Sequence, residues 1–145
     1  MAQNSPSEVL EIGQRIIAKF LEPFGFVWFR GDSGKGSGGQ FASGFFERGD
    51  RRLELHYRWN LGLVSYHVGQ NGVSHEEYMR SLGHLSEARY PAVFENQLEA
   101  FEALTSDVRN FCEDFVSGSG DSIKTARKAA DQRLKLSGLA RLESK

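Results

Sequence analysis

The sequence has little of several features that would place it in a class. A single cysteine, Cys112, among 145 residues excludes a fold that is held by its own disulfides. No apolar run approaches the roughly 20 residues that a membrane-spanning helix needs. The start, Met1–Asn4, also lacks a charged segment followed by an apolar one. We therefore expect a cytoplasmic chain without a membrane segment.

No excess of charge of either sign is present. Eighteen lysines and arginines stand against nineteen aspartates and glutamates, so the net charge is −1. A whole-molecule field that would attract nucleic acid or an anionic membrane is missing. The composition disfavours both as partners. The length suits one domain, which can bury enough surface to fold without a disulfide or a metal.

The chain opens with signals for a helix. Ser5, Pro6 and Glu8 combine a capping serine, a proline at the first helical position and a glutamate that completes a capping box. Apolar residues then recur at three- and four-residue spacings from Val9 to Phe20, which predicts an amphipathic helix. The β-rich run 26–30 follows as the first expected strand.

An antiparallel meander is expected next. Gly31–Gly39 is too rich in glycine for a regular element and predicts a flexible connection. Strands 40–48 and 51–59 flank Gly49-Asp50, whose glycine suits a type II′ turn. Strand 63–68 follows the three-residue loop that ends in glycine. Together these segments predict about four strands.

The turn sets the register of the central hairpin. Phe46 then faces Leu53, whereas Phe45 faces Glu54, so one face of the sheet is apolar and the other mixed. Aromatic residues nevertheless fall on both faces, because Phe41 shares the mixed face with Phe45. One helix layer does not obviously cover both faces. Either the helices wrap the sheet edges, or an aromatic, arginine-bearing surface stays open.

Helices are expected after the sheet. Ser74 with Glu77 forms a second capping box and starts a short helix, and an apolar stripe marks a long helix over Gln97–Val116. A last helix begins at Asp121. The predicted fold is α+β in two layers, with an N-terminal helix, an antiparallel meander and three C-terminal helices. Residues 1–120 form the domain.

The last segment, 121–145, is a basic helix and tail that belongs to the same domain or docks loosely. It carries seven bases and three acids, net +4. Residues 95–120 carry six acids and one base, net −5. The two segments have the charges to attract each other.

Chemistry-bearing residues do not form a recognisable catalytic or metal motif. Four histidines are present, none at metal-ligand spacing: His56, His67, His75 and His84. His75 stands in the first turn of a helix beside two glutamates, where exposure to solvent is the default. Cys112 lies on an apolar stripe and is expected in the core. We predict no catalytic residue, no metal and no cofactor.

The leading functional hypothesis is a non-enzymatic module that binds another protein. Aromatic and arginine side chains dominate interface energies, and four of them are the candidate contact residues: Phe41, Phe45, Arg58 and Trp59. An acidic surface on the helix from Glu95 to Asp114 is a second way to meet a partner. Self-association through an open face or an edge strand is also open.

Two other classes of function remain as alternatives. Main-chain N–H groups of the Gly31–Gly39 segment would hold a small ligand or a nucleotide, with Lys35 adding charge; the residues of this candidate site are Gly34, Lys35, Gly36 and Ser37. The spacing does not match a P-loop. The third hypothesis is an enzyme with a site around His56 and His67.

Two stretches carry a resemblance to known families. The segment 20–26, Phe-Leu-Glu-Pro-Phe-Gly-Phe, is similar to small uncharacterised bacterial α+β families, some of them encoded near toxin-system immunity genes, and the likeness continues to Trp59. Residues 60–68 and 74–78 look like a bacterial family without an assigned activity. The resemblance implies a compact bacterial protein that binds another macromolecule, and it carries over no catalytic residue.

Overall fold

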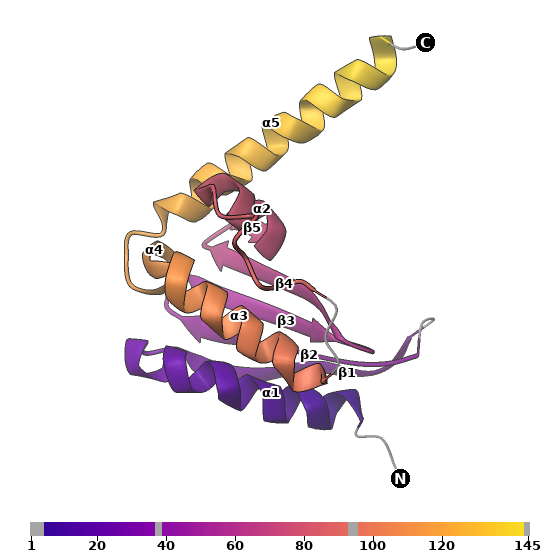
Figure 1. Ribbon diagram of the computed structural model, residues 1–145, viewed down its shortest axis with the longest axis vertical. Coiled ribbons are helices and arrows are strands. Elements are labelled where there is room, and N and C mark those ends of the chain that lie inside the picture. The colour runs from indigo at the N-terminus through magenta and orange to yellow at the C-terminus, as the bar shows by residue number, and fades with distance from the viewer. Residues whose placement is uncertain (1–4, 37–38, 93–95, 144–145) are drawn as a thin grey trace.

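The computed structural model describes residues 5–36, 39–92 and 96–143, in which helices lie against one face of an antiparallel sheet (Figure 1). In chain order the elements are α1 (Pro6–Leu21), the 3-10 helix η1 (Glu22–Phe24), β1 (Val27–Gly36), β2 (Gly39–Arg48), β3 (Arg51–Tyr57), β4 (Leu61–Val68), β5 (Asn71–Ser74), α2 (His75–Leu82), α3 (Gln97–Phe111), α4 (Glu113–Val116) and α5 (Asp121–Glu143).

The sheet is a meander in which the strands follow one another as β1-β2-β3-β4-β5, each antiparallel to the next. The predicted α+β class, with a helix first, an antiparallel sheet and then helices, is confirmed. The sheet has five strands instead of about four. The additional strand, β5, is four residues long and contains a glycine, so it shows no alternation that would mark it in the sequence.

The expected helix Gln97–Val116 is divided into α3 and α4. Two arginines beside the β2–β3 turn hold the end of α4. Arg51 Nη1 donates to the carbonyl of Phe115 at 2.7 Å, and Arg48 Nη1 donates to the carbonyl of Val116 at 2.6 Å. Carbonyls at a helix end lack helical partners, so these guanidinium groups satisfy them. The break lets Phe115 and Val116 both enter the core.

Helices α1 and α3 lie side by side across one face of the sheet (Figure 1). Helix α1 begins as predicted, because Ser5 Oγ accepts a hydrogen bond from the N–H of Glu8 at 3.3 Å. The two helices approach closely at Gly13, where a Cβ atom would lie 2.5 Å from the ring of Phe101. Only glycine allows this contact, and it brings both helices down onto the sheet.

The central hairpin has the predicted register. Gly49 has a φ of 57°, as the first central residue of a type II′ turn requires. Phe46 lies opposite Leu53, and Phe45 lies opposite Glu54. Phe46 and Leu53 are fully buried under the helices, whereas Phe45 is only partly buried. The sheet therefore has a covered face and a face without helices.

Two expectations about loops are wrong. Residues 31–36 of the expected flexible connection continue β1, with a bulge between Arg30 and Ser33, and Gly36 pairs with Gly39 of β2. The ladder tolerates Gly34 and Gly36 because they pair with Phe41 and Gly39 of β2, whereas Gly31 lies in the bulge. Two residues of the loop expected at 60–62, Leu61 and Gly62, also belong to a strand, since Leu61 pairs with the end of β3 and is buried in the core.

His75, expected in solvent, is buried in a polar network. Its Nε2 lies 3.0 Å from Oδ2 of Asp107, and its Nδ1 lies 2.7 Å from the hydroxyl of Tyr66. Asp107 also accepts hydrogen bonds from the N–H groups of Arg89 and Tyr90, at 2.8 and 2.9 Å. The network joins β4, the start of α2, the segment after α2 and the middle of α3.

Helix α5 starts against the body and then extends away from it (Figure 1). Ile123 and Ala126 in its first half are buried, and Arg127 Nη1 donates to the carbonyl of Gly72 at 3.2 Å. Leu134 and Leu136, farther along, are exposed. In the described part of the chain, no helix has both the length and the apolar character needed to cross a membrane.

Removing the Asp107 carboxylate should destabilise the protein more than removing an exposed carboxylate does. In Asp107→Ala two main-chain N–H groups and His75 lose their acceptor, which we expect to lower the free energy of unfolding by about 3–5 kcal/mol. Asp131→Ala, which breaks an exposed ion pair with Arg127, should cost less than about 1 kcal/mol. Urea denaturation of both variants checks this, and equal losses would contradict it.

Candidate functional site

The candidate site is the face of the sheet that α1 and α3 leave uncovered. We call it the open face. The side chains that define it come from β1 to β4 and from the residue after β3: Val27, Phe29, Phe41, Ser43, Phe45, Glu47, Arg52, Glu54, His56, Arg58, Leu63, Ser65 and His67. They alternate along each strand with residues of the covered face, as the pleat requires. Most are half-buried by one another, and Phe29 and Leu63 are exposed.

One cluster on the open face joins β1, β2 and β3. The rings of Phe29 and Phe45 stack with centroids 5.3 Å apart, and the guanidinium of Arg52 lies 4.1 Å above the ring of Phe45. Arg52 also pairs with Glu47 at 2.8 Å and with Glu54 at 3.4 Å. Hydrogen bonding to Glu47 is the main cause of a pKa of Arg52 above its usual value. The cation is held in place and neutralised on the sheet.

A second cluster lies nearer the β3–β4 turn. The ring of Phe41 stacks on His56 at 5.5 Å, and the guanidinium of Arg58 lies 5.8 Å from the ring centroids of Phe41 and Trp59. Trp59 is 72% exposed, the most exposed large apolar residue of the described chain. Three of the predicted contact residues, Phe41, Arg58 and Trp59, are thus brought together here, and Phe45 belongs to the first cluster.

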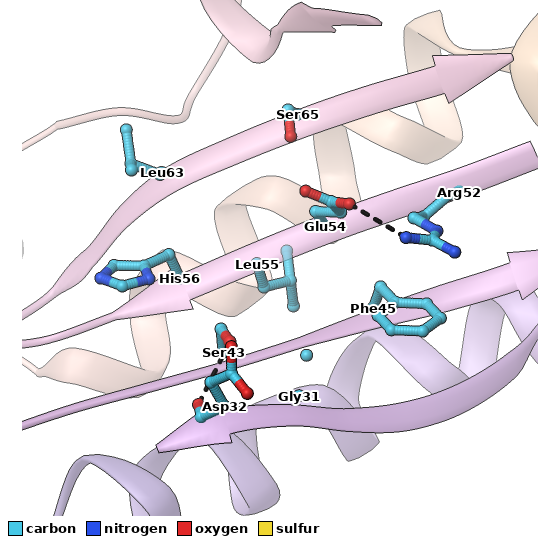
Figure 2. Close-up of a pocket in the computed structure, with 11 residues that line it drawn as sticks. Gly31, Asp32, Ser43, Phe45, Arg52, Glu54, Leu55, His56, Leu63 and Ser65 are labelled. Atoms are coloured by element: carbon cyan, nitrogen blue, oxygen red, sulfur yellow. Dashed lines mark hydrogen bonds and ion pairs between the residues drawn. The ribbon is translucent and has the colours of Figure 1, made fainter. Parts of the chain in front are cut away.

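A hollow of about 500 Å³ lies between the two clusters. Figure 2 shows Phe45 and Arg52 at one end of it and His56 at the other, where Ser43 lies opposite His56 on β2. The hollow exists because small residues of adjacent strands meet where larger neighbours stand on both sides. Its lining is Gly31, Asp32, Ser43, Gly44, Phe45, Arg52, Glu54, Leu55, His56, Leu63 and Ser65.

The histidines of the open face do not assemble a catalytic site. His56 lies opposite Leu63, and His67 is four residues farther along β4, so the two are roughly 13 Å apart. Ser65 Oγ lies 3.0 Å and Glu54 3.5 Å from the same nitrogen of His67, Nε2. A triad needs the acid on the other ring nitrogen. The described residues also contain no group of three or more His, Cys, Asp or Glu placed to hold a metal.

The buried network is also unsuited to catalysis. Tyr66, His75 and Asp107 are at most 2% exposed, and Cys112, which donates its S–H to the Tyr66 hydroxyl at 3.7 Å, is fully buried as expected. Burial raises the pKa of Cys112 to about 12 and raises that of Tyr66 well above its usual value. Neither is ionised near neutral pH, and no solvent reaches them, so the network is structural.

A sequence signal for this network did exist. His75 precedes Tyr78 and Met79 by three and four residues, and both are fully buried. Helical spacing therefore puts His75 on the inward side of α2. What the sequence did not show was the acceptor, because Asp107 lies 32 residues away on another helix.

The glycine-rich candidate site has a backbone different from the one expected. Gly34, Lys35 and Gly36 lie in β1 and pair with β2, and Ser37 lies outside the described residues. In a strand, successive N–H groups point to opposite edges, so they do not converge as a phosphate cradle requires. A nearby hollow of about 240 Å³ includes Gly34 and the start of α1. There the hydroxyl of Ser5 already caps the helix.

Comparisons with known proteins do not identify a relative. A scan against models of protein families gave no match, and neither did searches of curated proteins and of solved structures. The resemblance to immunity-type families therefore stays a hypothesis. Functional inference depends on the geometry of the open face.

Adjacent phenylalanines on β2 test the assignment of the two faces. Phe46→Ala empties a fully buried site and should lower the free energy of unfolding by about 3–5 kcal/mol. Phe45→Ala removes only contacts on the open face and should cost about 1 kcal/mol. Urea denaturation of the two variants measures the difference. A loss at Phe45 as large as that at Phe46 would mean that the open face is part of the core.

Proposed function

We propose that this chain is a non-enzymatic, cytoplasmic protein-binding module of the immunity or accessory type, which receives its partner on the open face. The observation that carries the proposal is the pair of arginine–aromatic clusters on a sheet face without helices. Aromatic and arginine side chains are enriched at the energetic centres of protein interfaces. The lone Cys112, buried and unpaired, is consistent with a reducing compartment.

The charge of the open face favours a protein over a nucleic acid. Arg52 is paired with Glu47 and Glu54, and Arg48 and Arg51 point to the covered side, where they hold α4. Few cations remain to contact phosphates, whereas nucleic-acid surfaces need an excess of them. A neutral face with rigid aromatic rings suits a folded or extended polypeptide.

The acidic helix is the weaker of the two expected binding surfaces. Asp107 is inside the polar network, and Asp114 binds Ser119 and the N–H of Ser122. Partial burial alone would raise the pKa of Asp114, but hydrogen bonds from Ser122 and Ser119 outweigh it and lower the pKa to about 2. The negative charge of Asp114 therefore stabilises the turn that leads into α5. The other acids on α3 and α4 are scattered, so they do not form the continuous negative surface that would mimic a phosphate backbone.

The hollow gives the partner a place to anchor. Apolar contact with Phe45 and Leu63 would bury a side chain of the partner, while Ser43 and Asp32 at its rim would accept hydrogen bonds. Anchors of this kind, fully desolvated and surrounded by a polar rim, contribute most of the affinity of a typical interface.

Capture from native cells, followed by titration with the purified partner, tests the proposal. The double variant Phe41→Ala/Phe45→Ala should weaken the affinity by about 30-fold or more, because two interface anchors of about 1 kcal/mol each are lost. Isothermal titration calorimetry measures the dissociation constant. Because Arg52 is already neutralised by Glu47 and Glu54 and the anchors are aromatic, the complex should also survive washes at high salt.

Ile12→Ala is the matched control. Ile12 is a large apolar residue that is exposed on α1, away from the open face, so its loss should leave the affinity unchanged. A complex that dissociates at high salt and tolerates the double variant would contradict the proposal and favour the acidic helix.

A further inference from the structure

The two edges of the sheet are protected to different degrees. Strand β5 is four residues long, and α5 lies against it, with Arg127 bound to the carbonyl of Gly72. Strand β1 is ten residues long, and no described element pairs with its outer side. An edge strand has a row of free N–H and C=O groups that pair readily with another strand. The β1 edge is therefore the reactive one.

The second half of β1 has its own protection. The bulge between Arg30 and Ser33 interrupts the ladder, and Asp32 is exposed beside it. Bulges and charges are common ways of preventing edge-to-edge pairing. The first half, Val27–Arg30, is regular and contains no proline. Val27 is 56% exposed and Phe29 45% exposed, so this half presents two apolar side chains on the open face.

We propose that a second copy of the chain pairs with this half of β1, antiparallel, about a two-fold axis at Trp28. Val27 then lies opposite Phe29 of the second copy, and Phe29 lies opposite its Val27. The same apolar pair therefore forms twice, once on each side of the axis. Opposite residues of an antiparallel pair share a face, which excludes an axis between Trp28 and Phe29. An axis at Phe29 would bring Gly31, beside the bulge, into the ladder.

Charge does not oppose this pairing. Arg30 is bound to Glu11 at 3.4 Å on its own copy. The two Arg30 residues stand four positions apart along the joined strands, at roughly 13 Å. That separation exceeds the Debye length of about 8 Å at physiological salt, so their repulsion is screened.

A second copy suits the edge better than a free peptide. The bulge limits the regular stretch to Val27–Arg30, so a single peptide gains few hydrogen bonds and must be ordered on binding. A folded copy has its strand already ordered, and the two-fold axis makes each favourable contact occur twice.

The mass of the purified protein in solution tests the dimer. Sedimentation and light scattering from micromolar concentrations upward should show a species of twice 16.3 kDa. Val27→Lys/Phe29→Lys places two charges of the same sign along the edge on each copy and should leave only the monomer, with an unchanged circular dichroism spectrum. Leu63→Lys is the matched control, since Leu63 is an even more exposed apolar residue of the open face away from β1, and it should stay dimeric.

Disulfide trapping tests the register without relying on the lysine variants. A mixture of Val27→Cys and Phe29→Cys should cross-link on oxidation, whereas either variant alone should cross-link far more slowly. Cys112 does not interfere, because it is buried and burial raises its pKa to about 12. A monomer at every concentration would overturn the proposal. So would a dimer that Leu63→Lys dissociates, or rapid cross-linking of Phe29→Cys alone. The test needs only purified protein, so it does not depend on whether the open face binds another protein.

Discussion

The close packing of α1 and α3 on a single face of the sheet is the constraint on which the other features depend. The two helices meet where Gly13 leaves room for the ring of Phe101, and together they seal the inward side chains of the strands. Because side chains alternate along a strand, every second residue of β2 and β3 must then point away from the helices. Within the described chain no helix lies over β1, β2 or β3 on that side, and only α5 borders it, where Arg127 and Leu134 line a hollow with Ser65 and His67 (Figure 1). The open face is therefore a consequence of the core, and its aromatic residues need another reason to be there.

The polar network around Asp107 holds this arrangement together where apolar packing alone would allow sliding. Burying a carboxylate is costly unless its oxygens are satisfied, and Asp107 has three donors from two distant parts of the chain. Such donors have directions, so α3 has one position relative to α2 and to β4. This fixed arrangement also stabilises the open face, because Phe29, Phe45 and Arg52 stack across three strands only while those strands keep one register.

Local signals in the sequence were sufficient for most of the fold. The caps at Ser5 and Ser74, the turn at Gly49 and the hairpin register depend on neighbouring residues, and the structure has each of them. The failures involve long-range pairing: the glycine-rich end of β1 is a strand only because β2 lies beside it, and His75 is buried only because Asp107 faces it. The same distinction applies to the site. Alternation placed Phe41 and Phe45 on the mixed face, whereas the contribution of Phe29 and the hollow at Ser43 depend on how β1 aligns with β2.

The proposed dimer and the open face are linked by geometry. A two-fold axis that relates two antiparallel edge strands of one continuous sheet runs perpendicular to that sheet, so both open faces point to the same side and both helix layers to the other. Pairing at β1 would double the five-stranded sheet and cover Phe29 from the side, while Phe41 and Phe45 on β2 stay open. A partner that is itself a two-fold dimer could then contact both open faces at once, and the second contact would form at a high effective concentration. Modest affinity at each face would be enough for firm binding, which a shallow hollow of about 500 Å³ on a neutral surface is suited to supply.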